Sequence, residues 1–235
     1  WRIEDTHPDL FRLTHYLLMS PFEKNILDGW NPSRENGFRA ALSYSAGVDS
    51  HACLSLMPKN TLVMYHERSG FKSALEHVNA VVMLEDLKEK GHPVIRVKSN
   101  HEQIRLDYGK SVGFSSDFAV GAMIILLADF YSINGVAYGM PLENSYLFHG
   151  HEGRDFERSW YWEHHRTIFK KAGLDLILPT AGISELINLK ISEQTENGRF
   201  AQSCLRSKIR GEVCGICWKC FRKNSLRGEP VNLSK

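Results

Sequence analysis

Short apolar runs alternate with segments of helical periodicity along most of the chain. Runs of strand character lie at 38–44, 61–65, 94–97, 136–140 and 174–178. Between and after them come helical segments: one that Pro58 stops, one at 73–90, a wholly apolar one around 118–131, one at 160–172, and one from about residue 184. Strands that alternate with helices this regularly predict a Rossmann-like α/β fold, in which a parallel sheet is sandwiched between helices and the crossovers are right-handed.

The two ends of the chain differ from this central region. Residues 1–37 carry one helical pattern and then a loop-rich stretch, so we expect an N-terminal helical appendage. Residues 38–200 hold the alternating strands and helices, and residues 201–235 hold a cluster of cysteines. The sequence therefore predicts three parts, with boundaries after residues 37 and 200.

Composition narrows the class of protein without identifying it. The 235 residues are 43% hydrophobic and 24% charged, which is typical of globular domains and excludes a disordered or collagen-like chain. The longest apolar run, 118–128, is too short to cross a bilayer. The opening residues form no secretory signal, so we expect a cytoplasmic protein without a membrane partner. A net charge of +2 does not by itself indicate a nucleic-acid partner.

The turn after the first expected strand has the composition of a phosphate-binding loop. Residues 45–50 read Ser-Ala-Gly-Val-Asp-Ser and open the next helix. Small residues let backbone N–H groups close around an anion, and the free N–H groups at a helix start point into the same space. Ligands of a parallel sheet bind beyond the carboxyl ends of its strands, where this turn lies. The alternative is a turn in which Asp49 or Ser50 only caps the helix.

Four of the five cysteines crowd near the end of the chain with the spacing of a metal site. They are Cys204, Cys214, Cys217 and Cys220. Thiolates at such tight intervals fold around one tetrahedral ion, so we expect structural zinc. The basic residues between 204 and 235 would then offset the negative charge of the cluster. An iron–sulfur cluster or redox chemistry is the alternative. We interpret the fifth, Cys53, as a small core residue.

At these positions the chain resembles a known superfamily. The loop at 45–50 is similar to the S-G-G-x-D-S motif of PP-loop ATP pyrophosphatases. Ala46 stands where the motif usually has glycine, and its methyl group costs about 1 kcal/mol if the backbone there is left-handed. Combined with four cysteines followed by Phe-Arg-Lys at 221–223, the loop makes the chain similar to the 7-cyano-7-deazaguanine synthase (QueC) family over about residues 38–225.

Other segments match this family more loosely or depart from it. Residues 65–68 read Tyr-His-Glu-Arg where the family has Tyr-Gly-Gln-Arg, and the runs at 139–144 and 179–185 lie where it has further motifs. Residues 114–117 replace a Pro-Gly-Arg-Asn segment, and Glu185 stands near an expected lysine. The departures indicate that the ATP half is retained and the acceptor pocket is altered.

The resemblance implies an ATP-dependent ligase. Such an enzyme adenylates a carboxylate, here of a 7-carboxy-7-deazaguanine type, releases pyrophosphate, and couples the carboxylate to ammonia or an amine. The product would be a nitrile, an amide or a macromolecular conjugate, and relatives in anti-phage defence operons join a deazaguanine to another macromolecule. The implied cofactors are ATP, Mg²⁺ and Zn²⁺. The implied partners are a deazapurine-like small molecule and, as open alternatives, a protein or nucleic-acid acceptor and a second copy of the chain.

The resemblance also assigns the site residues. The catalytic residues are Ser45, Asp49 and Ser50, of which Asp49 would orient Mg²⁺ or its waters. The nucleotide site would comprise Ser43, Ser45, Ala46, Gly47, Val48, Asp49, Ser50, Tyr65, Arg68 and Gly139. The acceptor site would comprise Glu67, Glu143 and Asn144. The metal ligands are Cys204, Cys214, Cys217 and Cys220.

Two other functions stay open at this point. Sulfur transfer to a tRNA base would keep the PP-loop but needs a reactive cysteine near it, and we expect Cys53 to point into the core. A non-catalytic zinc-ribbon protein would bind nucleic acid through its basic tail and keep the loop as a relic, against which the intact Asp49 and Ser50 argue. The histidines and aromatic residues of 146–166 indicate either a second metal site or a helix with solvated imidazoles.

Overall fold

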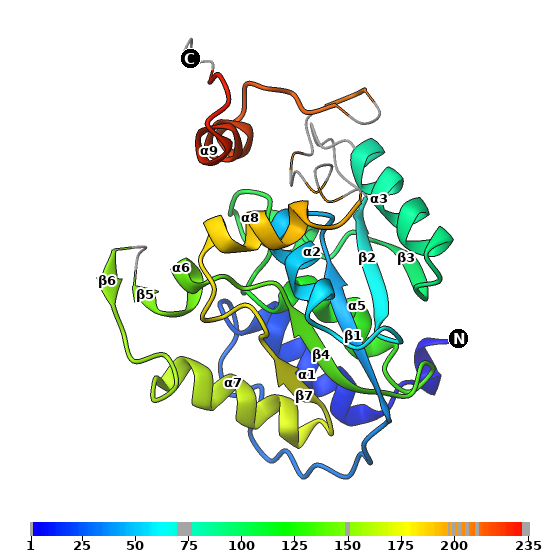
Figure 1. Cartoon of the computed structure of the whole chain (residues 1–235). Helices are drawn as coiled ribbons and strands as arrows, with labels where there is room; N and C mark the ends of the chain where they lie inside the picture. Colours follow the sequence, from blue (N-terminus) through cyan, green and yellow to red (C-terminus); the bar gives the residue numbers. More distant parts are fainter. Residues whose placement is uncertain are drawn as a thin grey trace.

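A five-stranded parallel sheet forms the centre of the molecule (Figure 1). The computed structural model describes residues 2–69, 77–148, 151–196, 198, 201, 204, 207–209 and 212–231. The strands are β1 (Arg39–Tyr44), β2 (Leu62–Arg68), β3 (Val94–Ser99), β4 (Ile133–Tyr138) and β7 (Asp175–Ile177), in the order β3-β2-β1-β4-β7. The expected parallel sheet and its five strands are confirmed.

Helices cover both faces of the sheet. The helices of the described residues are η1 (Ile3–Asp5), α1 (Pro8–Met19), α2 (Val48–Ser55), α3 (Val78–Glu89), α4 (Gln103–Asp107), η2 (Ala119–Gly121), α5 (Ala122–Leu126), α6 (Leu142–Ser145), α7 (Trp160–Lys171), α8 (Glu185–Glu193) and α9 (Trp218–Arg227). A small antiparallel hairpin, β5 (Leu147–Phe148) with β6 (Glu152–Gly153), follows α6. None of the helices in the described part of the chain is both long and apolar enough to span a membrane.

Successive residues of each strand belong to opposite cores. Ala41 packs in one cluster with α1, α5 and α7, whereas Leu42 packs in the other with α2, α3 and α8. Val136 and Ala137 of β4 divide in the same way. This is the two-residue period of a strand, here with both faces apolar because helices cover both. The fold is therefore three-layered, with the sheet in the middle (Figure 1).

Local signals explain most helix boundaries. Ser159 and Ser184 each accept a hydrogen bond in the first turn of α7 and α8, from Trp162 N and Ile187 N. Pro8 begins α1, where its missing N–H costs nothing. The helices α7 and α8 begin within two residues of where the sequence places them.

The expected long helix at 118–131 is broken into shorter pieces, which corrects the prediction. The chain forms η2, then the five residues of α5, and then turns that lead to β4. Gly121 packs directly on the Tyr138 side chain, and a Cβ there would lie 2.1 Å from the hydroxyl oxygen. Because the run is apolar on all sides, its sequence contains no periodicity that marks such an interruption.

The N-terminal segment shares the main core. Leu10, Leu13 and Leu17 of α1 are fully buried in the cluster beneath the sheet. Asp9 accepts hydrogen bonds from Trp30 Nε1 and from two backbone N–H groups of the loop that follows. Arg34 of that loop donates to the carbonyl oxygen of Ile133 at the start of β4. Residues 8–34 are thus attached to the sheet by both apolar and polar contacts.

Candidate functional site

The turns after β1 and β4 meet at one edge of the sheet. The chain builds β1, β2 and β3 outward on one side and then returns to place β4 on the other side of β1. A crevice at such a change of direction is where open α/β sheets bind ligands. Gly139 allows the two turns to touch, since a Cβ there would lie 2.6 Å from the backbone nitrogen of Ser50.

A cavity of about 240 Å³ opens at this point. Its lining joins both turns with the segment before α5: Ser43, Ser45, Asp49, Ser50, Asp117, Val120, Tyr138, Gly139, Met140, Pro141 and Asn144. The only ionisable side chains among these, apart from the tyrosine, are the carboxyl groups of Asp49 and Asp117. The cavity lining therefore carries no positive charge of its own.

The loop that opens α2 is held by its two serine hydroxyls. Ser45 N donates to Ser50 Oγ at 3.2 Å, Gly47 N donates to Ser45 Oγ at 3.3 Å, and Ser50 Oγ donates to Gly47 O at 3.0 Å. Ala46 has a left-handed backbone, with φ of 57°. No side chain caps α2 at Gly47, so the N–H groups of its first turn are left for a ligand. Neither Asp49 nor Ser50 caps α2, so the loop stays a candidate anion-binding site.

Asp49 lies between the cavity and a group of charged residues from α8 and α9. Asn188 Nδ2 donates to Asp49 Oδ1 at 3.0 Å, while Asn188 Oδ1 is buried without a hydrogen-bond partner. Burial raises the pKa of Asp49 above its ordinary value, and the charge of Lys223 is the strongest opposing influence. Glu143 accepts the backbone N–H of Glu185 at 3.1 Å and so fixes the start of α8.

The structure brings six of the expected site residues together at the cavity. They are Ser43, Ser45, Asp49, Ser50, Gly139 and Asn144. Ala46, Gly47 and Val48 belong to the same loop, but the Val48 side chain is buried in the core and contributes only backbone. Glu143 lies beside this group as the partner of α8.

Three expected residues at the end of β2 lie away from this cavity and have partners there. Tyr65 is buried, and its hydroxyl is hydrogen-bonded to His77 Nδ1. Arg68 forms an ion pair with the buried Glu102, and Glu67 pairs with Arg96 of β3 at 2.7 Å. These residues do not line the cavity because the end of β2 is occupied by its contacts with β3 and α4.

Sequence reasoning missed several residues of the site. Asp117 lines the cavity and accepts a hydrogen bond from Tyr161 at 2.7 Å, although the sequence shows it only as a departure from a family motif. Asn188 of α8 donates a hydrogen bond to Asp49, and the charge of Lys223 of α9 acts on the same carboxyl group. No spacing in the sequence connects these residues with Asp49. The sequence shows Lys223 only as the last residue of the Phe-Arg-Lys run that follows Cys220, with no role attached to it.

The four C-terminal cysteines converge on one point. Their sulfur atoms all lie within 4.8 Å of one another, with separations of 3.5 Å for Cys217–Cys220, 3.7 Å for Cys214–Cys220 and 3.9 Å for Cys217–Cys204. Tetrahedral zinc with bonds of about 2.3 Å needs ligand separations of about 3.8 Å. The donor set therefore fits a single tetrahedral ion. Of the other basic residues in this segment, Arg206, Arg210 and Lys235 lie outside the described residues.

The histidines of α7 serve in aromatic packing. His164 Nε2 is hydrogen-bonded to the Tyr16 hydroxyl at 2.7 Å, and its ring stacks on the exposed Trp160. His165 is buried against Phe118. Within the described ranges no metal-ligand group of three or more includes them, and His149 lies outside those ranges.

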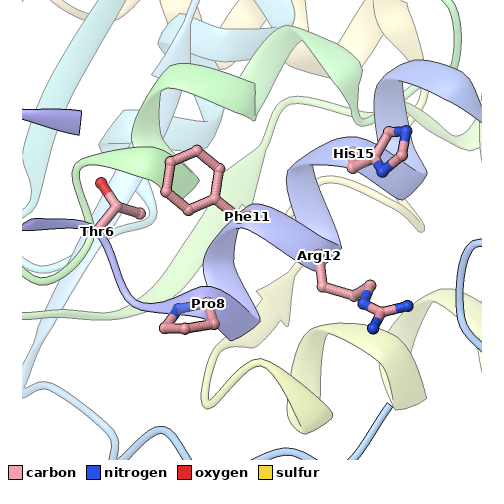
Figure 2. A pocket seen from close by; sticks show the side chains of 5 residues that line it. All are labelled: Thr6, Pro8, Phe11, Arg12 and His15. Atoms are coloured by element: carbon pink, nitrogen blue, oxygen red, sulfur yellow. The ribbon is translucent and has the colours of Figure 1, made fainter. Parts of the chain in front are cut away.

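A second hollow lies on the outer side of α1 (Figure 2). It is lined by Thr6, Pro8, Phe11, Arg12 and His15. Its polar groups already have partners, since Arg12 donates to the Ile26 carbonyl and His15 pairs with Glu23. We therefore place the candidate site at the cavity beyond the carboxyl ends of β1 and β4.

The chain is similar to a protein-family model and to solved structures. Residues 164–229 match the model of a family of unknown function, DUF6395, and this span includes α8, the four cysteines and α9. Among solved structures, the chain is similar to the U34-tRNA thiolase NcsA from Methanococcus maripaludis with its 4Fe–4S cluster, at 14% identity and a TM-score of 0.44, over 93% of this chain and 71% of that one. A search of curated proteins found no match.

Proposed function

We propose that this protein is an enzyme that uses ATP to activate a carboxylate as its adenylate and then joins the carboxylate to ammonia or an amine. The observation that carries the proposal is the uncapped start of α2 behind a loop of small residues, at the point where the sheet changes direction. The same place holds the cavity with Asp49 and the two serine hydroxyls. Helix starts of this kind bind phosphate groups in nucleotide enzymes.

The proposed reaction has two displacements. A carboxylate oxygen of the acceptor attacks the α-phosphorus of ATP, the bond to the bridging oxygen breaks, and pyrophosphate leaves. An amine nitrogen then attacks the acyl carbon, AMP leaves, and the nitrogen gives up a proton. The N–H groups of α2 and the hydroxyls of Ser45 and Ser50 would bind the phosphates, which is the electrostatic stabilisation that phosphoryl chemistry requires.

Each metal has its own place in the proposal. Mg²⁺ is usually held by substrate phosphates with one or two carboxylates, a role that Asp49 and Asp117 would fill at the cavity. Zn²⁺ would be held by the four cysteines, whose sulfur separations suit ligands of one ion. A cluster of several irons distributes its thiolates over different metal atoms, so its ligands stand further apart than these.

The identity of the acceptor rests on the sequence resemblance alone. It implies a 7-carboxy-7-deazaguanine-type carboxylate, with a protein or nucleic acid as an alternative final acceptor, and a role in anti-phage defence. Proteins of this kind work in the cytoplasm, which is our proposed location.

Sulfur transfer to a tRNA base would begin with the same adenylation and differ in the nucleophile. Burial raises the pKa of Cys53 to about 12, so the cysteine nearest the loop is not a thiolate at neutral pH. The other described cysteines are gathered in the metal cluster. We therefore favour a nitrogen nucleophile over a sulfur carrier.

An isotope-transfer experiment tests the proposal by measuring whether ¹⁸O passes from the carboxylate of the acceptor to AMP. Protein, MgATP, ammonium and 7-carboxy-7-deazaguanine with ¹⁸O in its carboxylate are incubated, and the products are separated and weighed by mass spectrometry. We expect AMP that carries one ¹⁸O, with pyrophosphate. Asp49→Ala is expected to reduce AMP formation about 100-fold or more with the fold intact, whereas the exposed Asp107→Ala control stays active. ADP with phosphate, or full activity of Asp49→Ala, would contradict the proposal.

A further inference from the structure

The buried side of α9, the last described helix, is polar. The two buried residues of α9 are Cys220 and Lys223, which lie on one side of the helix at a spacing of three. Arg227 continues the same side one turn further on. This inner face has a metal ligand and two cations where a packed helix normally has an apolar stripe. Hydrophobic burial therefore does not explain where α9 docks.

Two ion pairs join α9 to α8, and Figure 1 shows where these two helices lie. Arg222 is paired with Glu185 at the start of α8, and Arg227 is paired with Glu193 at its end, at 2.6 Å. Lys223 lies between Arg222 and Arg227 along α9 and is one of the two buried residues of this helix. The stretch of α8 between the two pairs contains Asn188, the hydrogen-bond donor to Asp49.

Lys223 is 5% exposed, and no hydrogen bond or ion pair joins its ammonium group to the residues that the structure describes. Its strongest attractive charges are Asp49 and then Glu185, while Arg222 and Arg227 repel it. Lys223 is in turn the strongest attractive charge that acts on Asp49. Burying an ammonium without a bonded anion is costly, so an anionic ligand would supply what the protein lacks there.

The cavity needs such a cation. Asp49 and Asp117 make its lining negative, and a nucleotide would add several negative charges from its phosphates. The phosphate loop contains no lysine or arginine. Asn188, whose Nδ2 donates to Asp49, has a buried Oδ1 that lacks a hydrogen-bond partner.

We propose that Lys223 binds the phosphate groups of the nucleotide, and that the metal-bound cysteine segment serves to hold this lysine at the site. The inference rests on the proposed function, because it names a further binding residue of the same site. It makes the C-terminal segment a part of the nucleotide site and not a separate structural module.

Calorimetric titration with MgATP and with magnesium pyrophosphate tests the inference. Lys223→Met is expected to weaken both affinities about 10–100-fold, the range for losing one charge-assisted hydrogen bond. Lys223→Arg is expected to recover most of the affinity, since it keeps the charge. Lys219→Met is the matched control, because Lys219 is exposed on the same helix and its loss leaves both affinities unchanged.

Two further measurements separate phosphate binding from a purely structural role. The metal content of Lys223→Met should equal that of the wild type, which shows that the cysteine segment is intact. If Lys223→Met is unstable, the pair Asp49→Asn and Asp49→Asn/Lys223→Met is compared, since the Asp49 charge is then absent from both. A further loss of pyrophosphate affinity in the double variant supports the inference, and equal affinities overturn it.

The outcomes for the two proposals differ. Binding of MgATP that is equal in wild type and Lys223→Met overturns the role of Lys223 and leaves the proposed function standing. Binding that depends on Lys223 without formation of AMP overturns the proposed function and supports the role of Lys223. A wild-type protein that binds neither MgATP nor pyrophosphate overturns both.

Discussion

Ala46 carries backbone strain at the centre of the phosphate loop. Its φ of 57° is in the left-handed region, where a Cβ is crowded and glycine is free. The sequence shows only that alanine replaces a usual glycine, and it leaves open which backbone the position adopts. The structure decides the matter, because the loop must bend sharply between β1 and α2 to present the helix start.

Ala46→Gly is therefore expected to stabilise the protein. The free energy of unfolding should rise by ~0.5–1 kcal/mol, because the relief of strain exceeds the added entropy of glycine in the unfolded chain. Urea unfolding measures it. The control is Ala52→Gly within α2, which has ordinary helical backbone and should lose about 1 kcal/mol or more. A destabilised Ala46→Gly would contradict the assigned conformation.

The sequence predicted which loop residues lie together at the cavity better than it predicted which other residues join them. Ser45, Asp49 and Ser50 are adjacent in sequence, so the turn itself fixes their geometry. Tyr65 and Arg68 belong to the neighbouring strand β2, and their partners, His77 and Glu102, come from later segments. The sequence does not reveal such partners, because they depend on which elements pack beside β2.

At the scale of elements, α8 and α9 act as a unit. Two ion pairs join them, Asn188 donates a hydrogen bond to Asp49, and the charge of Lys223 acts on the same carboxyl group. Cys217 occupies the N-cap position of α9 without a side-chain capping hydrogen bond, and Cys220 lies in the first turn. Because α9 buries so little apolar surface, we expect its position to depend on a metal bound by the cysteines as well as on the ion pairs.

Cys217→Ser should remove both the metal and the ordered position of α9. We expect about one zinc per chain in the wild type and close to none in the variant, because zinc-binding energies of ~10–16 kcal/mol order small segments of this kind. Elemental analysis measures the metal, and limited proteolysis measures exposure of the C-terminal segment. Cys53→Ser, a buried cysteine outside the cluster, keeps its metal. A metal-free variant with a fully protected segment would refute the structural role.

At the scale of the whole molecule, three buried histidines make the fold sensitive to acid. Burial lowers the pKa of His51 and His66 to about 4 and that of His101 to about 3. Above pH 6.5 these groups are neutral in both folded and unfolded chains and have no effect. As the pH falls from 6.5 toward 4, the unfolded chain takes up protons that the folded chain excludes, so stability declines.

The contribution of His51 can be isolated. Its ring is hydrogen-bonded to Tyr44 and Thr195, and its shift corresponds to a loss of about 3 kcal/mol between pH 6.5 and 4. His51→Gln is expected to be less stable at pH 7 and to lose less stability on acidification. Denaturant unfolding at a series of pH values measures this, with the exposed His15→Gln as the control. An unchanged slope for His51→Gln would show that this imidazole does not set the acid sensitivity.

The sequence by itself determined the strand and helix alternation, the loop that opens α2 and the four-cysteine spacing, because each depends on residues close together in the chain. Tertiary structure alone decided that α1 joins the core, that the β1 and β4 turns share a cavity, and that Lys223 lies near Asp49. These contacts follow from the order of strands and the docking of α9 on α8. Long-range packing of this kind has no local pattern in the sequence, since many partners would satisfy the same apolar or charged residue.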